Sequence, residues 1–330
     1  PTGVATIDVD LDAELDLTSS RFEMQRRRYR LPEALHELAP YVLRNSSEGR
    51  APFNGANVRL DVDIDRSAIS AGESFSVRRG SFFTSLASNE LTRWSLEEKS
   101  DPWDFRGRFL FEQDGTVQPL SRSQLGNGIG VSTLAITADD YLILVLQSKA
   151  NQTSSGLWAP SGSGAMEPRD FGGQRNPLLR TAVLAGAERE LNEESRIGSD
   201  QVLGGSVIGY SRWLDRGAKP EFYCVTALHT HSRDVRQGTH THPWWSAERN
   251  WTSDVTIQHL SLERAARAKL KTTSAPLWRQ AGLVTAPERL EESISLPLSL
   301  ALDALTRSMR RNPGFMDDLR RSSADTKAAR

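Results

Sequence analysis

Arg189-Glu190-Leu191-Asn192-Glu193-Glu194 lies near the end of residues 177–197, a stretch whose pattern predicts a helix. Glu190, Glu193 and Glu194 stand at i, i+3 and i+4, so a helix of 3.6 residues per turn projects them from one face. Three carboxylates on one face repel one another, and those nearest the helix C-terminus also oppose the helix dipole. The stretch therefore predicts a cation among these side chains.

A divalent metal ion is the simplest such cation. Mg²⁺ and Mn²⁺ prefer oxygen ligands and keep bound water, which suits carboxylates that must also admit the phosphate oxygens of a substrate. Arg189 is spaced i, i+4 from Glu193 and could hold the acidic face in register. The alternative is an acidic helix end exposed to solvent.

The same hexapeptide resembles the signature of the Nudix hydrolases, which ends in Arg-Glu-aliphatic-any-Glu-Glu, one further residue, glycine and an aliphatic residue. Arg189 to Glu194 and then Ile197 match that signature position by position, whereas Arg196 stands where the family has glycine. Residues 157–164 resemble the strand and glycine-rich entry that open the signature, with Gly164 as its first glycine.

The middle of the signature departs from the family pattern. Asp170 lies six residues after Gly164, where the family has glutamate. The family then reaches its arginine in eight residues, but Arg189 lies nineteen residues after Asp170, an insertion of eleven residues. Gly172-Gly173 and Pro177 predict that the insertion forms a loop followed by a helix.

The resemblance implies an α+β fold, a Nudix-type α/β/α sandwich with a mixed sheet. It also implies a hydrolase that uses Mg²⁺ or Mn²⁺ to cleave the diphosphate bond of a nucleoside diphosphate linked to another group. By the family pattern, the metal ligands would be Glu190, Glu193, Glu194 and a carbonyl oxygen of Gly164. Arg189 would complete the catalytic set.

The general base differs between members of the resembled family, so several candidates stay open. Glu193 is the first candidate, and Glu248 or Asp254 in the later part of the chain is the next. Asp170 could orient the helix or a water molecule. The residues that bind the substrate, and the nucleotide itself, are unknown. The alternative to an enzyme is a catalytically weak or inactive Nudix-like sensor that binds a nucleotide.

Composition excludes several classes of protein. The chain has 330 residues, 38% of them hydrophobic, which is ordinary for a globular protein. A lone cysteine, Cys224, excludes an internal disulfide framework. The formal net charge of −1 gives no overall attraction to nucleic acid or to an anionic membrane, so binding of nucleic acid is not expected. With neither a long apolar run nor a secretory pattern, the expected location is the cytoplasm.

Residues 1–125 are expected to form a smaller β-rich α+β module of unknown role. Alternating or apolar runs at residues 57–64, 75–79 and 106–112 predict strands there. The module could form a homodimer or bind a protein partner.

Residues 126–312 are expected to form the Nudix-like domain. Apolar runs at residues 131–136 and 141–147 flank an acidic turn and predict a hairpin that opens this domain. Apolar residues at helical spacing predict a packing helix over residues 294–311. Residues 313–330 are polar and basic and are expected to be a disordered tail.

Histidines gather after the predicted strands. His229 with His231, and His240 with His242, place two imidazoles on one face of an extended segment, which could bind zinc or nickel. Contacts to the substrate, or a polar surface loop, are the alternatives.

A basic cluster, Arg26-Arg27-Arg28-Tyr29-Arg30, lies near the N-terminus. It could bind phosphates or RNA, but a solvated surface is the favoured interpretation because the charge of the whole chain is nearly balanced.

Overall fold

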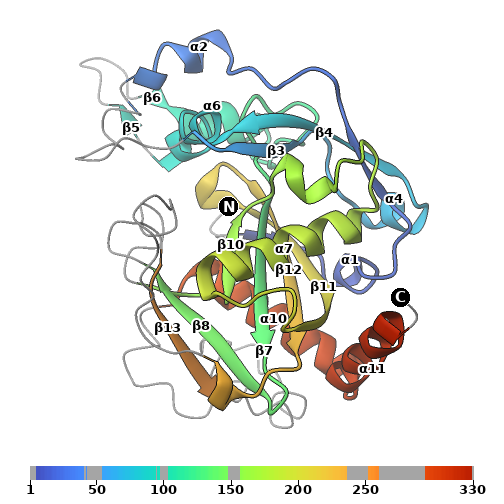
Figure 1. Cartoon of the computed structure of the whole chain (residues 1–330). Coiled ribbons are helices and arrows are strands. Elements are labelled where there is room, and N and C mark those ends of the chain that lie inside the picture. Colours follow the sequence, from blue (N-terminus) through green and yellow to red (C-terminus); the bar gives the residue numbers. More distant parts are fainter. Residues whose placement is uncertain are drawn as a thin grey trace. The chain divides into compact units, whose positions relative to one another are not determined.

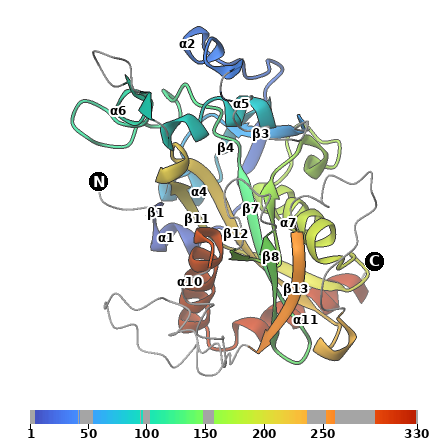
Figure 2. The ribbon, with the colours of Figure 1, turned by 90° about the vertical axis from the view of Figure 1, so that its left-hand side faces the viewer.

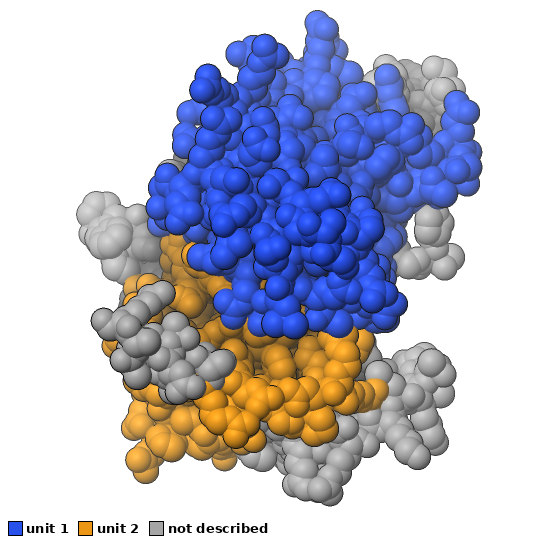
Figure 3. All heavy atoms as spheres, turned by 90° about the vertical axis from the view of Figure 1, so that its right-hand side faces the viewer, with its two compact units in different colours: residues 1–130, 165–183, 210–222 blue, residues 131–164, 184–209, 223–330 orange. Residues whose placement is uncertain are grey.

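The computed structural model describes residues 5–40, 42, 54–93, 95–96, 103–147, 157–235, 252–259 and 294–328, with the backbone alone at residues 93, 95–96, 103–104, 252–259 and 322–328. Figure 1 shows the ribbon of the whole chain. The chain divides into two compact units, coloured in Figure 3. Unit 1 contains residues 1–130, 165–183 and 210–222, and unit 2 contains residues 131–164, 184–209 and 223–330.

The protein is α+β with mixed sheets, as predicted. The largest sheet has eight strands in the order β1-β11-β12-β7-β8-β13, with β10 paired to β7 and β9 paired to β8. Its strands are β1 (Ala5–Ile7), β7 (Gly130–Ile136), β8 (Tyr141–Gln147), β9 (Trp158–Ala159), β10 (Gly162–Ala165), β11 (Val202–Trp213), β12 (Lys219–Leu228) and β13 (Thr252–His259).

The strands β7 and β8 pair antiparallel, which confirms the predicted hairpin. In unit 2, helices lie on both faces of this hairpin (Figures 1 and 2). Leu134 and Leu144 belong to one apolar cluster with residues of α10 (Leu296–Arg311), among them Leu302. Their neighbours in sequence on β7 and β8 belong to a second cluster with Leu191 of α7 (Leu179–Ser195). Successive strand residues point to opposite faces, so the hairpin is the middle of a helix–sheet–helix sandwich.

Residues 315–328 do not match the disordered tail that the sequence predicts for residues 313–330. They form the helix α11 (Phe315–Ala328). Met316 and Leu319, which stand three residues apart, are both buried in the apolar cluster of α10. The sequence prediction gave weight to the many polar residues of the segment, but two buried side chains on one helix face are enough to attach it to the core.

Unit 1 contains a three-stranded sheet in the order β2-β4-β3, with β2 (Arg21–Met24) parallel to β4 (Ser74–Ser81) and β3 (Ala56–Leu60) antiparallel to it. The strand predicted at residues 75–79 is thereby confirmed, and the one predicted at residues 57–64 is confirmed up to Leu60, where β3 ends. A second sheet pairs β5 (Ser95–Leu96) with β6 (Trp103–Asp104).

The described helices of unit 1 are short. They are α1 (Val9–Asp12), α2 (Glu33–His36), α4 (Arg66–Ser70), α5 (Phe82–Leu86) and α6 (Phe105–Leu110). The strand predicted at residues 106–112 was wrong, because Phe105 and Phe109 are spaced by one helical turn and α6 buries both in one cluster. No helix in the described part of the chain is long and apolar enough to cross a bilayer.

Replacement of Leu319 by alanine tests whether α11 is packed. Leu319 is 7% exposed, and removing a buried leucine side chain costs about 2 to 3 kcal/mol, so we expect the free energy of unfolding to fall by that amount. Arg321→Ala is the matched control, because the exposed Arg321–Asp318 ion pair contributes little. Urea denaturation measures both; an unchanged midpoint in L319A would mean that α11 is not packed on the core.

Candidate functional site

The acidic hexapeptide occupies the last two turns of α7, which confirms the predicted helix over residues 177–197. Glu190 and Glu194 are 7% and 3% exposed, so neither projects freely into solvent. The side chain of Glu193 is more open, at 23% exposure. The three carboxylates therefore share one helix but differ in how deeply they are buried.

Ser161 fixes the chain just before β10. Its hydroxyl accepts a hydrogen bond from the backbone N–H of Ala135 in β7 at 2.7 Å and donates one to the carbonyl of Ile143 in β8 at 2.6 Å. The hydroxyl of Ser195, the last residue of α7, donates to the carbonyl of Ser161. Ser161 thus ties the start of β10 to both hairpin strands and to the end of α7.

Gly162 lets β10 approach the backbone of α7. A Cβ atom at this position would lie 2.6 Å from the carbonyl carbon of Glu190 and would also overlap the backbone nitrogen of Leu191. Real Cβ atoms do not approach backbone this closely, so only glycine fits here.

Two of the carboxylates lie against the rest of β10. Glu194 accepts a hydrogen bond from the backbone N–H of Ser163 at 2.8 Å and one from the side-chain amide of Gln147 at 3.3 Å. The carboxylate of Glu190 fills the space that a Cβ atom of Gly164 would occupy. The structure therefore places the carboxylates of Glu190 and Glu194 beside the Ser163–Gly164 backbone, and their role as metal ligands stays a prediction.

Arg189 joins the other pair of carboxylates. Its Nη1 atom lies 2.7 Å from Oε1 of Glu190 and 3.0 Å from Oε2 of Glu193. Because both oxygens bond to one nitrogen, they are separated by no more than the sum of these two distances. The guanidinium group supplies the positive charge that the crowded carboxylates require, and the predicted i, i+4 pairing of Arg189 with Glu193 is confirmed.

The donor set suits a hard divalent ion in its chemistry, because it consists of carboxylate oxygens beside a glycine backbone. The arrangement is not that of a closed site, however: across the described residues, no three acidic, imidazole or thiol side chains converge enough to hold a metal. Binding of Mg²⁺ or Mn²⁺ here would require the carboxylates to turn toward one another and at least one of them to leave Arg189.

Arg196 follows α7 at the position where the resembled signature has glycine. Its φ is 60°, in the left-handed region, and its N–H bonds to the carbonyl of Asn192 at 3.1 Å. Glycine adopts this conformation without steric cost, whereas other residues lose about 1 kcal/mol or more. The departure from the family pattern therefore preserves the backbone turn that glycine would form.

Of the three candidates for a general base outside the hexapeptide, the structure describes two. Asp170 lies in a turn of 3₁₀ helix (Pro168–Phe171) in unit 1, where it accepts a hydrogen bond from the N–H of Glu167 at 2.7 Å. Asp254 lies in β13, opposite Leu146 of β8, in a segment of which only the backbone is described. Glu248 lies outside the described residues.

The histidine pair at residues 229–231 is engaged in local contacts. Nε2 of His229 bonds to the carbonyl of Asp200, and Nδ1 of His231 lies 3.9 Å from Asp139. Partial burial alone would raise the pKa of Asp139, but hydrogen bonds led by Ser232 outweigh it and lower that pKa to about 2. His240 and His242 lie outside the described residues, so a zinc or nickel site at these histidines stays a prediction.

No model of a known protein family matches the sequence, and no curated protein matches it. The solved structures that resemble part of the chain include two crystal structures. The first is DR0079 from Deinococcus radiodurans, at 15% identity over 52% of this chain and 96% of that one, with a TM-score of 0.27. The second is the MutT protein from Methanosarcina mazei Go1, at 14% identity over 55% of this chain and 93% of that one, with a TM-score of 0.28. Structural similarities this weak support no inference about activity.

Alanine substitutions at the two glycines of β10 should differ in their cost. Gly162→Ala places a methyl group against the backbone of α7, which cannot move alone, so we expect the free energy of unfolding to fall by about 3 kcal/mol. Gly164→Ala meets only the carboxylate of Glu190, which can rotate away, so about 1 kcal/mol is expected. Equal losses in urea denaturation would contradict the close contact at Gly162.

Replacement of Arg196 by glycine should stabilise the chain. Glycine removes the steric strain that a left-handed backbone imposes on Arg196 in the folded state, and it also raises the conformational entropy of the unfolded chain. Because the first effect is the larger, we expect the free energy of unfolding to rise by about 0.5 to 1 kcal/mol. Glu188→Gly, inside α7, is the control and should lose about 1 kcal/mol. A loss in R196G would show that the turn at residue 196 is not left-handed.

Proposed function

We propose that this chain is a metal-dependent hydrolase of the diphosphate bond in a nucleoside diphosphate linked to another group. The observation that supports it best is the contact between α7 and β10. Glu190 and Glu194 are buried, and each lies against the Gly162–Gly164 backbone instead of pointing into solvent. Burying two carboxylates beside a third costs desolvation free energy and adds electrostatic repulsion. Carboxylates clustered in this way are typical of sites that bind a cation and a charged substrate.

In this proposal Glu190, Glu193, Glu194 and the carbonyl of Gly164 hold Mg²⁺ or Mn²⁺. When bound, the ion would neutralise the diphosphate and lower the pKa of a water molecule. The positive charge of Arg189 reduces the electrostatic repulsion between the carboxylates of Glu190 and Glu193 before the substrate binds. Glu193 has a partly exposed carboxylate, so it is the candidate that can accept a proton from the water that attacks phosphorus.

A second candidate function, a nucleotide-binding sensor with little or no turnover, is favoured by one observation. Arg189 already pairs with two of the three carboxylates, and Glu194 is bonded to the backbone of β10 and to Gln147. A chain that keeps these contacts when a nucleotide binds would have no need of a metal ion.

The test is an assay of the purified chain with ADP-ribose, diadenosine polyphosphates, NAD and nucleoside triphosphates, with Mg²⁺ or Mn²⁺. We expect release of a monophosphate from at least one of them. Glu193→Gln and Glu194→Gln should lower kcat/KM by roughly 100-fold or more, because each removes one charge from the metal and proton-transfer groups. Glu188→Gln is the control, since it removes the same charge from the same helix and should leave kcat/KM within about twofold.

The metal is tested separately from turnover by the electron paramagnetic resonance spectrum of Mn²⁺. Wild-type chain should reduce the signal of free Mn²⁺, and E194Q should reduce it less. Tight nucleotide binding that needs no metal and gives no product would instead establish the sensor.

A further inference from the structure

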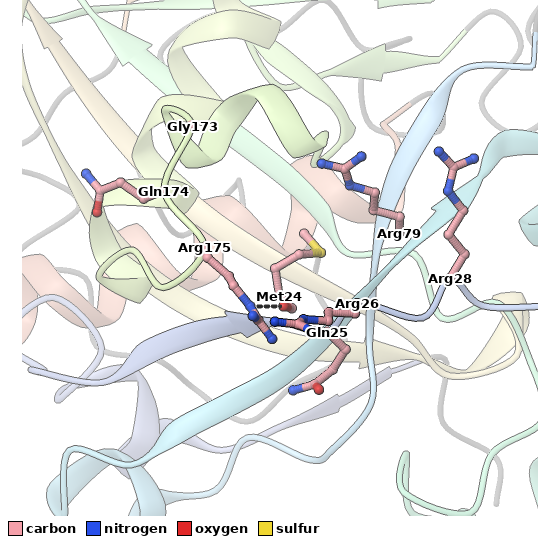
Figure 4. A pocket seen from close by; sticks show the side chains of 8 residues that line it. All are labelled: Met24, Gln25, Arg26, Arg28, Arg79, Gly173, Gln174 and Arg175. Atoms are coloured by element: carbon pink, nitrogen blue, oxygen red, sulfur yellow. Dashed lines mark hydrogen bonds between the residues drawn. The ribbon is translucent and has the colours of Figure 1, made fainter.

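A recess in unit 1 is lined by eight residues, four of which are arginines from three separate segments. Figure 4 shows the residues around it. They come from the end of β2 and the loop after it, from β4, and from the loop before α7: Met24, Gln25, Arg26, Arg28, Arg79, Gly173, Gln174 and Arg175. The recess has a volume of about 500 Å³, within the range of roughly 300 to 1,000 Å³ that is usual for small-molecule sites.

Among the described residues, no carboxylate forms an ion pair with any of the four arginines of the recess. Neighbouring arginines behave differently. Arg78, next to Arg79 on β4, pairs with Asp61 at 2.7 Å, and Arg59 pairs with the same carboxylate. Because successive side chains of a strand point to opposite faces, Arg78 reaches Asp61 on one face of β4 while Arg79 lines the recess on the other.

Main-chain hydrogen bonds hold the walls of the recess in place. Met24 and Arg175 exchange two bonds, from the N–H of Met24 to the carbonyl of Arg175 and from Nε of Arg175 to the carbonyl of Met24, each 3.0 Å long. The N–H of Tyr29, just after Arg28, bonds to the carbonyl of Arg79 at 2.9 Å. The arginines are thus mounted on fixed backbone before any ligand arrives, which lowers the entropy cost of binding.

The loop before α7 reaches the recess through two successive left-handed residues. Gly172 and Gly173 have φ values of 57° and 76°, and no atom lies within 4 Å of the position of a Cβ at either residue. Glycine is therefore needed for the turn and not for packing. This turn belongs to the insertion that separates Asp170 from Arg189, so the insertion supplies one wall of the recess.

We propose that this recess binds a small molecule that carries two or more linked phosphates, such as an inorganic polyphosphate or the phosphate chain of a nucleotide. Guanidinium groups bind phosphate oxygens in pairs of parallel hydrogen bonds, and four of them around one cavity match several phosphates on one ligand. Figure 4 shows Arg28 and Arg79 projecting in the same direction, as two groups that grip one anion would. Gln25 and Gln174 add neutral donors. The site does not depend on the proposed hydrolysis.

The experiment is calorimetric titration of the full chain with sodium tripolyphosphate and, separately, with ATP, both in EDTA so that the carboxylates of α7 hold no metal. We expect one site per chain for tripolyphosphate. The double substitution Arg28→Ala and Arg79→Ala should weaken binding by about tenfold or more, because each removes charge-assisted hydrogen bonds to phosphate. Tighter binding of ATP than of tripolyphosphate would identify a nucleotide as the source of the phosphates, and equal binding would identify the phosphate chain alone.

Arg27→Ala is the matched control. Arg27 lies between two lining arginines in the sequence but does not line the recess, so its loss should change the affinity by less than about twofold. Unchanged thermal unfolding of every variant confirms that the fold is kept. The proposal is overturned if tripolyphosphate does not bind, if R27A weakens binding as much as the double variant does, or if a 20-nucleotide single-stranded RNA binds more tightly than tripolyphosphate and ATP.

Discussion

The contact between β10 and α7 depends on the missing Cβ atom at Gly162. Without that atom the strand lies directly on the helix backbone at Glu190 and Leu191, and the hydroxyl of Ser161 holds the strand between β7 and β8. This contact fixes the backbone of β10 against that of α7, so the carboxylates of Glu190 and Glu194 come to lie beside the backbone of the strand. The positions of the buried carboxylates on the acidic face depend on this contact.

Sequence pattern predicted the β7–β8 hairpin and the helices α7 and α10. Both β7 and β8 are largely apolar runs whose side chains point alternately to the two faces of the sheet, and α10 and α7 cover these faces. The sandwich itself was expected from the family resemblance and not from periodicity. The errors arose where few residues decide the structure. Two apolar side chains attach α11 to the core, and a pair of phenylalanines one turn apart makes α6 a helix.

The candidate site was predictable in its residues but not in its electrostatics. The spacing of Glu190, Glu193 and Glu194 places them on one helix, but no sequence pattern shows that Arg189 bonds to two of them or that Ser163 donates to the third. Those contacts depend on how β10 meets the helix, a relationship between segments far apart in the chain. The same is true of the arginine recess, whose walls come from three segments that each look like ordinary solvated surface.

The most direct measurement is the anomalous diffraction of a crystal of the full chain grown with Mn²⁺. The account predicts an anomalous peak bounded by the carboxylates of Glu190, Glu193 and Glu194 and the carbonyl of Gly164, with Arg189 turned away from at least one of the carboxylates. A crystal in which Mn²⁺ is absent from these residues, while Arg189 still bonds to Glu190 and Glu193, would contradict it.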